Sequence, residues 1–363
     1  MLRADGDKSL QKFRVRSFLW LLAKTSFTLP RNGVACFTFH LNKNNVVLKS
    51  KRRNTMYTKL FALFCSISFA LFSSGISTEA QVPTSAKIVF ESWRDGNGEI
   101  YIMNADGSKE ENLTRHGARD GAPVWSPTGK HIAFHSDRDG TRDIYIMNPN
   151  GRNVRKVLRN LSYREYPTWS PDGKKLAYTR SEDWSICIAD IEKRTEESVA
   201  FTDIVGGFAD WSPNGSEIVF IFVKPSDYRI HIINLKTGEQ SELPLPPNIP
   251  PPWVEGRFFY FPAWSRDGDT IAFSWRTKGL HLMNREGEDV TKIIQGTRPA
   301  WSPQGDQLLY DTDQRIFRLD INSGNKTLLS RDGFGADWFD PATLPVEPNA
   351  ALLTTQWGKL KQK

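Results

Sequence analysis

The chain has few of the residues on which disulfide-rich, metal-binding and helical domains depend. Its 363 residues include three cysteines, and these form no Cys-x-x-Cys pair. Only Cys187 lies beyond residue 80, and its neighbours Ile186 and Ile188 are apolar. We therefore expect neither a disulfide framework nor a cysteine metal or redox site, and Cys187 is expected to be a small buried side chain. Helical periodicity is almost absent as well, which argues against a helical fold.

The sequence also lacks a basic surface, once its charge is located. The formal net charge of +7 comes from residues 1–55, which carry twelve Lys and Arg and only two Asp. Residues 81–363 carry 35 basic and 38 acidic residues and have a net charge of −3. A phosphate backbone needs clustered positive charge, so a nucleic-acid partner is not expected.

No apolar run is long enough for a full membrane span, which needs about 20 residues. Residues 56–59 supply a short charged segment, residues 60–72 an apolar stretch, and small residues follow up to Ala80. This pattern predicts a secretory signal peptide over 56–80, cut after Ala80, with an uncleaved anchor as the alternative. We expect the protein in the periplasm or outside the cell, with membrane contact only through this segment. Residues 1–55 are interpreted as a non-native or disordered basic extension, or alternatively as a cytoplasmic tail.

What the sequence does contain is a repeat. Six tryptophans open similar boxes, at steps of 44, 42, 53, 37 and 37 residues. The boxes are Trp125-Ser-Pro-Thr-Gly, Trp169-Ser-Pro-Asp-Gly, Trp211-Ser-Pro-Asn-Gly, Trp264-Ser-Arg-Asp-Gly, Trp301-Ser-Pro-Gln-Gly and the degenerate Trp338-Phe-Asp-Pro. Repeats of this length indicate a solenoid or a propeller.

Each repeat contains the same succession of short β runs and tight turns. In the first, residues 130–134 and 143–147 are apolar runs rich in β-formers, and the Asn148-Pro-Asn-Gly151 turn follows them. With a weaker strand before the next box, each repeat forms a four-stranded antiparallel blade. We predict an all-β, six-bladed β-propeller over residues 86–341. Residues 342–363 form a C-terminal extension.

The two ends of the repeat region are complementary. The chain enters mid-blade, with strands at residues 87–90 and 99–103 but no box before them, and it ends on a box without following strands. We therefore expect the segment around Trp338 to pair with the strand that begins at Lys87 and to close the ring, which removes exposed sheet edges. The six box tryptophans are predicted to fill the interfaces between blades as structural anchors, not as a functional site.

At these boxes the sequence resembles the family of TolB-like propeller repeats with their Trp-Ser-Pro-Asp-Gly signature, over about residues 86–341. The resemblance implies a propeller that binds other proteins or peptides in the cell envelope, or that acts as a non-catalytic gate. TolB itself has an α/β domain before the propeller, whereas here the predicted signal peptide runs almost directly into Lys87.

Few residues suggest chemistry. Asp137, Asp139 and Asp143 alternate as in part of a calcium loop, but a hairpin turn is the favoured interpretation. His131 and His135 lie about 13 Å apart on one predicted strand face, too far apart to share a metal. His231 and His281 occupy equivalent places in two blades and could line one face of the ring. No G-x-S-x-G nucleophile elbow occurs.

The long step between boxes holds a proline-rich insert over residues 243–262. Its stiff prolines and aromatics make it a candidate partner-binding loop, against the alternative of a plain surface decoration. The candidate contact residues are Pro250, Trp253, Phe258, Phe259 and Tyr260. We predict a non-catalytic, monomeric binding protein without cofactor or metal. The alternatives are a metal-dependent propeller enzyme, such as a polysaccharide lyase, and a glycan or small-ligand sensor.

Overall fold

The computed structural model describes residues 25–28, 36–41, 44–49, 81–201, 207–224, 227–244 and 259–344. The chain divides into two compact units, Met1–Thr78 and Glu79–Lys363. The described part of the first unit is a three-stranded antiparallel sheet of β1 (Thr25–Thr28), β2 (Cys36–Leu41) and β3 (Asn44–Lys49), in that order. It falls within the segment interpreted as an extension, an interpretation that stays a prediction. The predicted signal peptide lies outside the described residues.

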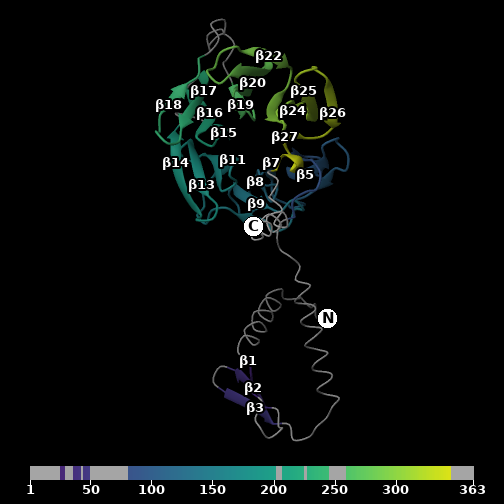
Figure 1. Cartoon of the computed structure of the whole chain (residues 1–363), viewed down its shortest axis with the longest axis vertical. Coiled ribbons are helices and arrows are strands. Elements are labelled where there is room, and N and C mark those ends of the chain that lie inside the picture. Colours follow the sequence, from purple (N-terminus) through teal and green to yellow (C-terminus); the bar gives the residue numbers. More distant parts are fainter. Residues whose placement is uncertain are drawn as a thin grey trace, which may run out of the picture. The chain divides into compact units, whose positions relative to one another are not determined.

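The second unit is a ring of six four-stranded antiparallel sheets, as predicted (Figure 1). Blades I to V follow the chain, and blade VI combines its two ends in the order β27-β4-β5-β6. The innermost strands, each contacting the next around the ring, are β7 (Asp120–Trp125), β11 (Arg164–Trp169), β15 (Gly207–Trp211), β19 (Phe259–Trp264), β23 (Thr297–Trp301) and β27 (Phe334–Phe339). The second strands are β8 (Ile132–Ser136), β12 (Lys175–Arg180), β16 (Glu217–Lys224), β20 (Thr270–Trp275), β24 (Gln307–Thr312) and β4 (Lys87–Ser92).

The outer halves of the blades complete the ring. The third strands are β9 (Asp143–Met147), β13 (Ser185–Asp190), β17 (Asp227–Asn234), β21 (Gly279–Asn284), β25 (Arg315–Asp320) and β5 (Glu99–Asn104). The outermost strands are β10 (Arg155–Lys156), β14 (Thr195–Phe201), β18 (Gln240–Glu242), β22 (Thr291–Ile294), β26 (Lys326–Ser330) and β6 (Glu111–Asn112). A short 3-10 helix, η1 (Pro341–Thr343), follows β27.

The two ends of the repeat region share blade VI, which confirms the predicted ring closure. In the antiparallel pairing of β27 with β4, Trp338 stands opposite Ile88. The junction with blade I is tied by the Trp125 amide, which donates to Asp337 Oδ2 at 2.7 Å. The Trp125 and Phe339 rings pack with their centroids 5.4 Å apart.

The tryptophan boxes make the turns between first and second strands. In the first five boxes the serine hydroxyl accepts a hydrogen bond from the amide five residues later, as Ser126 Oγ does from His131 N at 3.0 Å. The glycine that ends the box has a positive φ, 66° at Gly129, which costs little without a Cβ. The box therefore fixes the start of each second strand.

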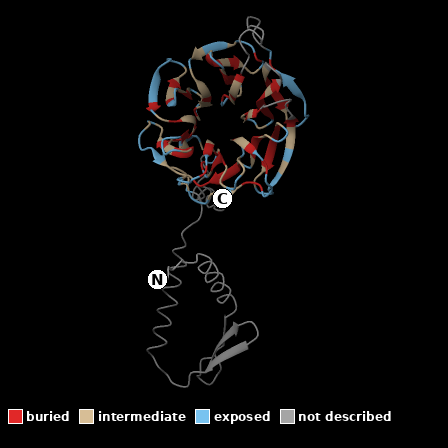
Figure 2. Ribbon diagram, turned by 180° about the vertical axis from the view of Figure 1, so that it is seen from behind, coloured by how far each residue is buried: buried red, intermediate tan, exposed pale blue. Residues whose placement is uncertain are grey.

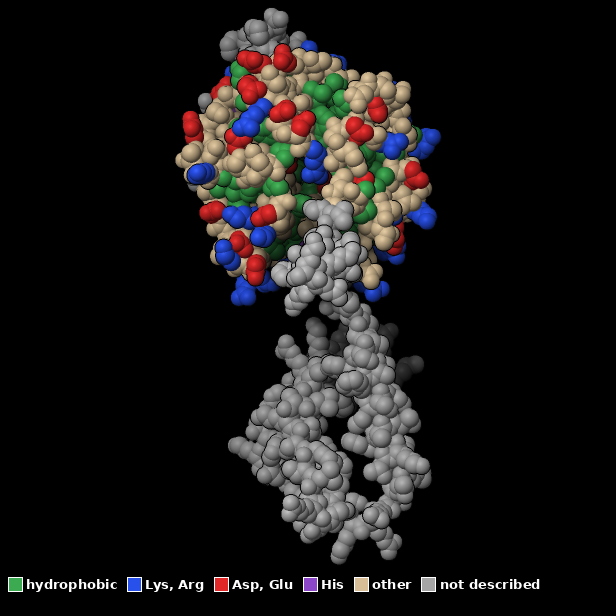
Figure 3. All heavy atoms as spheres, viewed as in Figure 1, with side chains coloured by type: hydrophobic (Ala, Val, Ile, Leu, Met, Phe, Trp, Pro, Cys, Tyr) green, Lys and Arg blue, Asp and Glu red, His purple; other side chains and the backbone are tan. Residues whose placement is uncertain are grey.

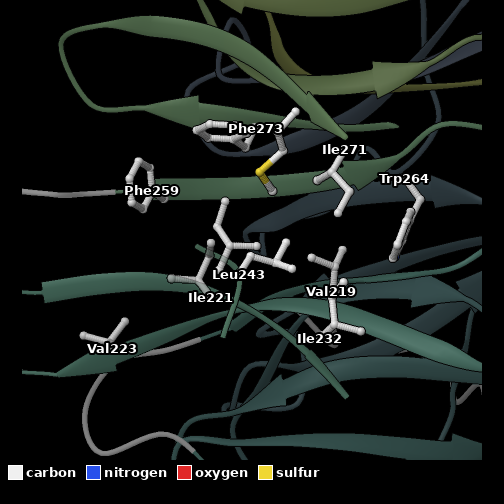
Figure 4. Packing of buried hydrophobic residues seen from close by; sticks show 11 residues of the cluster. Val219, Ile221, Val223, Ile232, Leu243, Phe259, Trp264, Ile271 and Phe273 are labelled. Atoms are coloured by element: carbon white, nitrogen blue, oxygen red, sulfur yellow. The ribbon is translucent and has the colours of Figure 1, made fainter. Parts of the chain in front are cut away.

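The core lies within and between the blades, and exposed residues gather on the outer strands (Figure 2). The largest cluster joins blades III and IV, where Val219, Ile221 and Ile232 face Trp264 and Phe273 (Figure 4). Second strands are buried on both faces, which explains why they read as continuous apolar runs and do not alternate. Both signs of charge are interspersed over the face shown in Figure 3. Among the described residues, no helix is long and apolar enough to cross a membrane.

Candidate functional site

The residue three places before each box tryptophan has a left-handed backbone. In all six innermost strands the pairing with the second strand shifts register just before the tryptophan, which is a β-bulge. The residues at this position, with φ between 48° and 59°, are Ala122, Tyr166, Phe208, Phe261, Arg298 and Gly335. Bulky residues rarely adopt this conformation, and it costs about 1–3 kcal/mol when they do. Five of the six bulges are therefore strained, and the sixth is relieved by Gly335; we call the six residues together the bulge ring.

Polar side chains of the preceding blade hold three of these bulges. Glu91 Oε2 accepts from the Ala122 amide at 3.2 Å, Ser274 Oγ from the Arg298 amide at 3.0 Å, and Asp311 Oδ1 from the Gly335 amide at 3.0 Å. All three acceptors are buried in second strands. Burial raises the pKa of the Glu91 carboxyl, and it raises that of Asp311 to about 6. These buried polar groups thus connect neighbouring blades at the bulge ring.

The side chains of the bulge ring differ in type from one side of the propeller to the other. Blades II, III and IV contribute consecutive aromatic rings, with centroids 4.6 Å apart for Tyr166 and Phe208 and 4.3 Å apart for Phe208 and Phe261. Blade V contributes Arg298, whose guanidinium lies 4.9 Å from the Phe261 ring and 5.0 Å from the Phe334 ring. Blades VI and I contribute only glycine and alanine. One side of the ring is therefore an aromatic arc, and on the other side the bulge residues are small.

A cavity of about 890 Å³ opens beside this arc, at the face that carries the turns between second and third strands. We call it the mouth cavity. Its aromatic walls are Trp93, Phe208, Tyr260, Phe261, Trp275 and Phe334. Its charged residues are Arg276, Arg298, Asp311 and Asp313, so its formal charge is balanced. The size and lining fit a site for a small ligand or a few residues of a chain, for which about 300–1,000 Å³ is usual.

Trp93 forms the rim of the mouth cavity and is 41% exposed. Its Nε1 donates to Glu91 Oε1 at 2.9 Å. The Arg119 guanidinium lies 4.6 Å from the centre of its ring. Two neighbours thus fix an exposed aromatic side chain in place, and Glu91 connects it to the bulge at Ala122.

The rim is low at blades IV and V, where six-residue second and third strands are joined by short turns. The turn between β24 and β25 has two residues, Asp313 and Gln314, both with positive φ. The turn between β20 and β21 has three, residues 276–278. The corresponding connections of blades VI and I, residues 93–98 and 137–142, have six each. The cavity is therefore bounded by short turns on one side and longer ones on the other.

The structure divides the predicted contact residues of the insert. Phe259 and Tyr260 are the first residues of β19, not part of a free loop. Phe259 is 1% exposed and packs in the core, because its ring lies 5.5 Å from that of Phe273, whereas Tyr260 lines the mouth cavity. Leu243, at the other end of the insert, is also buried in the core. Pro250, Trp253 and Phe258 lie outside the described residues.

His231 and His281 are packing residues of separate blades. His231 stacks on Phe222 with centroids 4.7 Å apart, and its Nδ1 lies 2.9 Å from Gln240 Nε2. His281 packs between Phe273 and Trp275, and burial lowers its pKa. Neither residue lines the mouth cavity. Each imidazole is buried and packs against aromatics of its own blade, and the expectation that the two line one face of the ring stays a prediction.

The first-blade histidines lie against blade II. His131 precedes β8 and stacks on Trp169 at 6.4 Å, while His135 meets the edge of Tyr166 at 5.6 Å. His135 is 4% exposed, and its Nδ1 has no hydrogen-bond partner among the residues that the structure describes. Burial lowers its pKa to about 3, so the ring is neutral. His135 is therefore a buried neutral residue of the blade interface.

The alternating aspartates of blade I do not converge. Asp137 accepts from the Arg119 amide, Asp139 from the Tyr145 hydroxyl, and Asp143 is paired with Arg164 and Lys156. The segment is the turn between β8 and β9, as the hairpin interpretation has it. In the described ranges no group of three or more His, Cys, Asp and Glu is placed to hold a metal.

Sequence reasoning missed the bulge ring and the mouth cavity. The signal was present, because Tyr166, Phe208, Phe261 and Arg298 all stand three places before a box tryptophan. Trp93 carried no repeat signal, since no other blade has an aromatic in the same turn position next to an acidic partner like Glu91.

Fold and site together define a six-bladed β-propeller with an aromatic-walled cavity at one mouth of its ring. The family model for the TolB beta propeller domain matches residues 66–253, just over half of the chain, so the chain belongs to this family. No curated protein matches it.

Solved structures show the same fold. TolB from Acinetobacter baumannii has a TM-score of 0.59 at 17% identity, covering 86% of this chain and 81% of that one. A putative TolB from Agrobacterium tumefaciens has a TM-score of 0.53 at 19% identity, covering 69% and 91%. A chain of a nidogen/laminin complex has a TM-score of 0.56 at 12% identity, covering 70% and 98%. At these identities the likeness concerns the fold alone.

Proposed function

We propose that the protein is an exported, non-catalytic propeller that binds a protein or peptide partner at the mouth cavity. The observation that carries this proposal is the cavity itself, because its aromatic walls are already held in place. Exposed aromatics in fixed positions are typical of binding hot spots, since little side-chain freedom is lost when a partner binds.

The buried carboxylate of the mouth cavity, Asp311, is engaged in holding the fold. Asp311 accepts from the Gly335 amide with one oxygen and from Arg298 Nη1, at 3.0 Å, with the other. A general acid or base must be free to exchange a proton with a ligand. Both oxygens of this carboxylate are engaged, so it suits the positioning of Arg298 and Gly335 better than catalysis. A metal-dependent enzyme or a glycan sensor is the competing function, and metal content and saccharide binding of the purified chain would reveal either.

Affinity capture with defined variants tests the partner-binding function. Residues 81–363 would be immobilised and exposed to envelope extract, with wild type, Trp93→Ala and Lys174→Ala compared. Lys174 is exposed in a box turn, at the opposite end of the strands from the cavity. A partner retained by wild type and Lys174→Ala but lost by Trp93→Ala is expected; retention by all three would place binding elsewhere.

The proline-rich insert remains a predicted contact element. Its deletion must be limited to residues 245–258, because Leu243 and Phe259 belong to the core. If the insert contributes, this deletion weakens capture while the unfolding transition is unchanged. Unaltered capture would leave the insert as a surface decoration.

Export rests on the predicted signal peptide over residues 56–80 and on membership of the family. Amino-terminal sequencing of the natural protein is expected to begin at Gln81. A natural protein that begins at Met1 would contradict this proposal.

A further inference from the structure

The mouth cavity combines three properties that restrict its ligand. Its walls are aromatic on several sides, its charges cancel, and its rim is low over blades IV and V. Aromatic walls favour a ligand with flat apolar faces, and balanced charges disfavour a strongly acidic or basic one. A low rim admits an extended chain from the side.

The polar part of the lining supplies hydrogen-bond donors. The side-chain amides of Gln295 and Gln314 and the hydroxyl of Thr277 lie along the low side of the cavity. Such donors suit a ligand with many carbonyl acceptors. A polyproline II segment has this chemistry, because it makes no internal hydrogen bonds and leaves its carbonyls free, while its rings present apolar faces.

The cavity walls are preorganised for such a ligand. Trp93 is held by Glu91 and Arg119, and Arg298 is held between two rings by Asp311. A proline-rich segment is stiff before it binds, so little conformational entropy is lost on either side. Grooves lined with aromatics recognise proline-rich segments in this way in several unrelated domains.

We propose that the mouth cavity binds an uncharged, proline-rich segment of a partner protein in the polyproline II conformation. The proposal rests on the proposed function and names the chemistry of its partner. Complementarity of charge favours it over an acidic segment, for which Arg276 and Arg298 are offset by Asp311 and Asp313, and over a nucleic acid for the same reason.

Calorimetric titration of residues 81–363 with synthetic peptides tests the proposal. The probes are a capped nine-proline peptide, a capped Gly-Ser peptide of equal length, and proline peptides carrying three Glu or three Lys. We expect the uncharged proline peptide to bind at least ten times more tightly than the Gly-Ser peptide. Equal affinity for these two, tighter binding of a charged peptide, or no binding of the proline peptide would overturn the proposal.

Variants locate the binding. Trp93→Ala is expected to weaken proline-peptide binding at least tenfold, Trp93→Phe less so, and Lys174→Ala not at all, with urea unfolding used to confirm that each variant is folded. If Trp93→Ala does not fold, the wild-type peptide comparison decides alone. Loss of captured partner in Trp93→Ala without any proline-peptide binding would refute this inference and leave the proposed function standing. If partner capture also fails to depend on Trp93, both are wrong.

Discussion

Two neighbouring residues at the start of β19 are predicted to have opposite roles. Phe259 points into the core between blades III and IV, where its ring meets those of Phe273 and Trp275, each with centroids 5.5 Å away. Tyr260 points to the mouth cavity, where its ring meets the edges of Phe208 at 5.9 Å and Tyr228 at 5.5 Å. Truncation of each to alanine separates stability from binding.

The expected loss of stability is larger for Phe259→Ala than for Tyr260→Ala. Phe259→Ala leaves a cavity in a fully buried site and should lower the free energy of unfolding by about 3–5 kcal/mol. In a unit of this size that corresponds to a fall in Tm of roughly 6–20 °C. Tyr260→Ala removes a few edge contacts, worth about 0.5–1.5 kcal/mol each, at a half-buried position, so a loss of about 2 kcal/mol or less is expected.

Guanidinium unfolding of residues 81–363, followed by circular dichroism, measures both changes. The midpoint should fall strongly for Phe259→Ala and weakly for Tyr260→Ala, with an unchanged slope m in both. Phe259→Leu, which keeps most of the apolar volume, should fall between wild type and Phe259→Ala. Equal losses for the two alanine variants, or a stable Phe259→Ala, would refute the assignment of these side chains.

Two further predictions concern packing between blades. In the unfolded chain the His135 imidazole takes up a proton with a pKa near 6.5, whereas in the folded chain burial lowers this pKa to about 3. His135 therefore lowers the free energy of unfolding as the pH falls below about 6.5, by roughly 2–3 kcal/mol at pH 4.5 and by nothing above pH 7.5. Unfolding measured at both pH values should show a smaller loss for His135→Leu than for wild type. An unchanged pH dependence would show that the imidazole is protonated in the folded chain. Gly151 and Gly140 both have positive φ, but a Cβ at Gly151 would lie 2.4 Å from the backbone oxygen of Leu113, whereas Gly140 faces open space. Both substitutions carry the backbone cost of alanine at positive φ, but Gly151→Ala should lower the free energy of unfolding by more than about 1 kcal/mol beyond Gly140→Ala. Equal unfolding midpoints would show that the blades can separate at this contact.

The fold could be predicted because its determinants are local and repeated. Each of the first five boxes supplies a serine cap, a turn glycine and a tryptophan within five residues, and the apolar runs that follow have strand length. Ring closure was also predictable, because the first half-blade and the last box are incomplete in complementary ways. The assignment of Phe259 to a free loop failed because an apolar run after prolines resembles a loop cluster as much as a strand.

The positions of the bulge ring could have been found from their spacing to the box tryptophans, but the buried polar contacts between blades could not, because they join distant positions. The buried Arg164 illustrates this: it is 0% exposed and bonded to Asp143 of blade I and Glu196 of its own outermost strand. Nothing in its local sequence distinguishes it from a surface arginine. The same holds for Glu91: its bond to Trp93 is local, but its bond to the Ala122 amide forms only where blades VI and I meet.

The bulge ring separates what the fold requires from what the site can vary. The left-handed bulge occurs in all six blades although its side chains range from glycine and alanine to phenylalanine and arginine. Since no side chain is common to the six, the bulge must be imposed by the backbone around the tryptophan box, and not by the residue that occupies it. The residue type at the bulge can therefore vary with the ligand of the site without a change of fold. A phenylalanine in this conformation costs about 1–3 kcal/mol of strain that a glycine would avoid. The aromatic arc of blades II to IV and Arg298 of blade V keep this cost, which indicates that their side chains serve the site and not the fold.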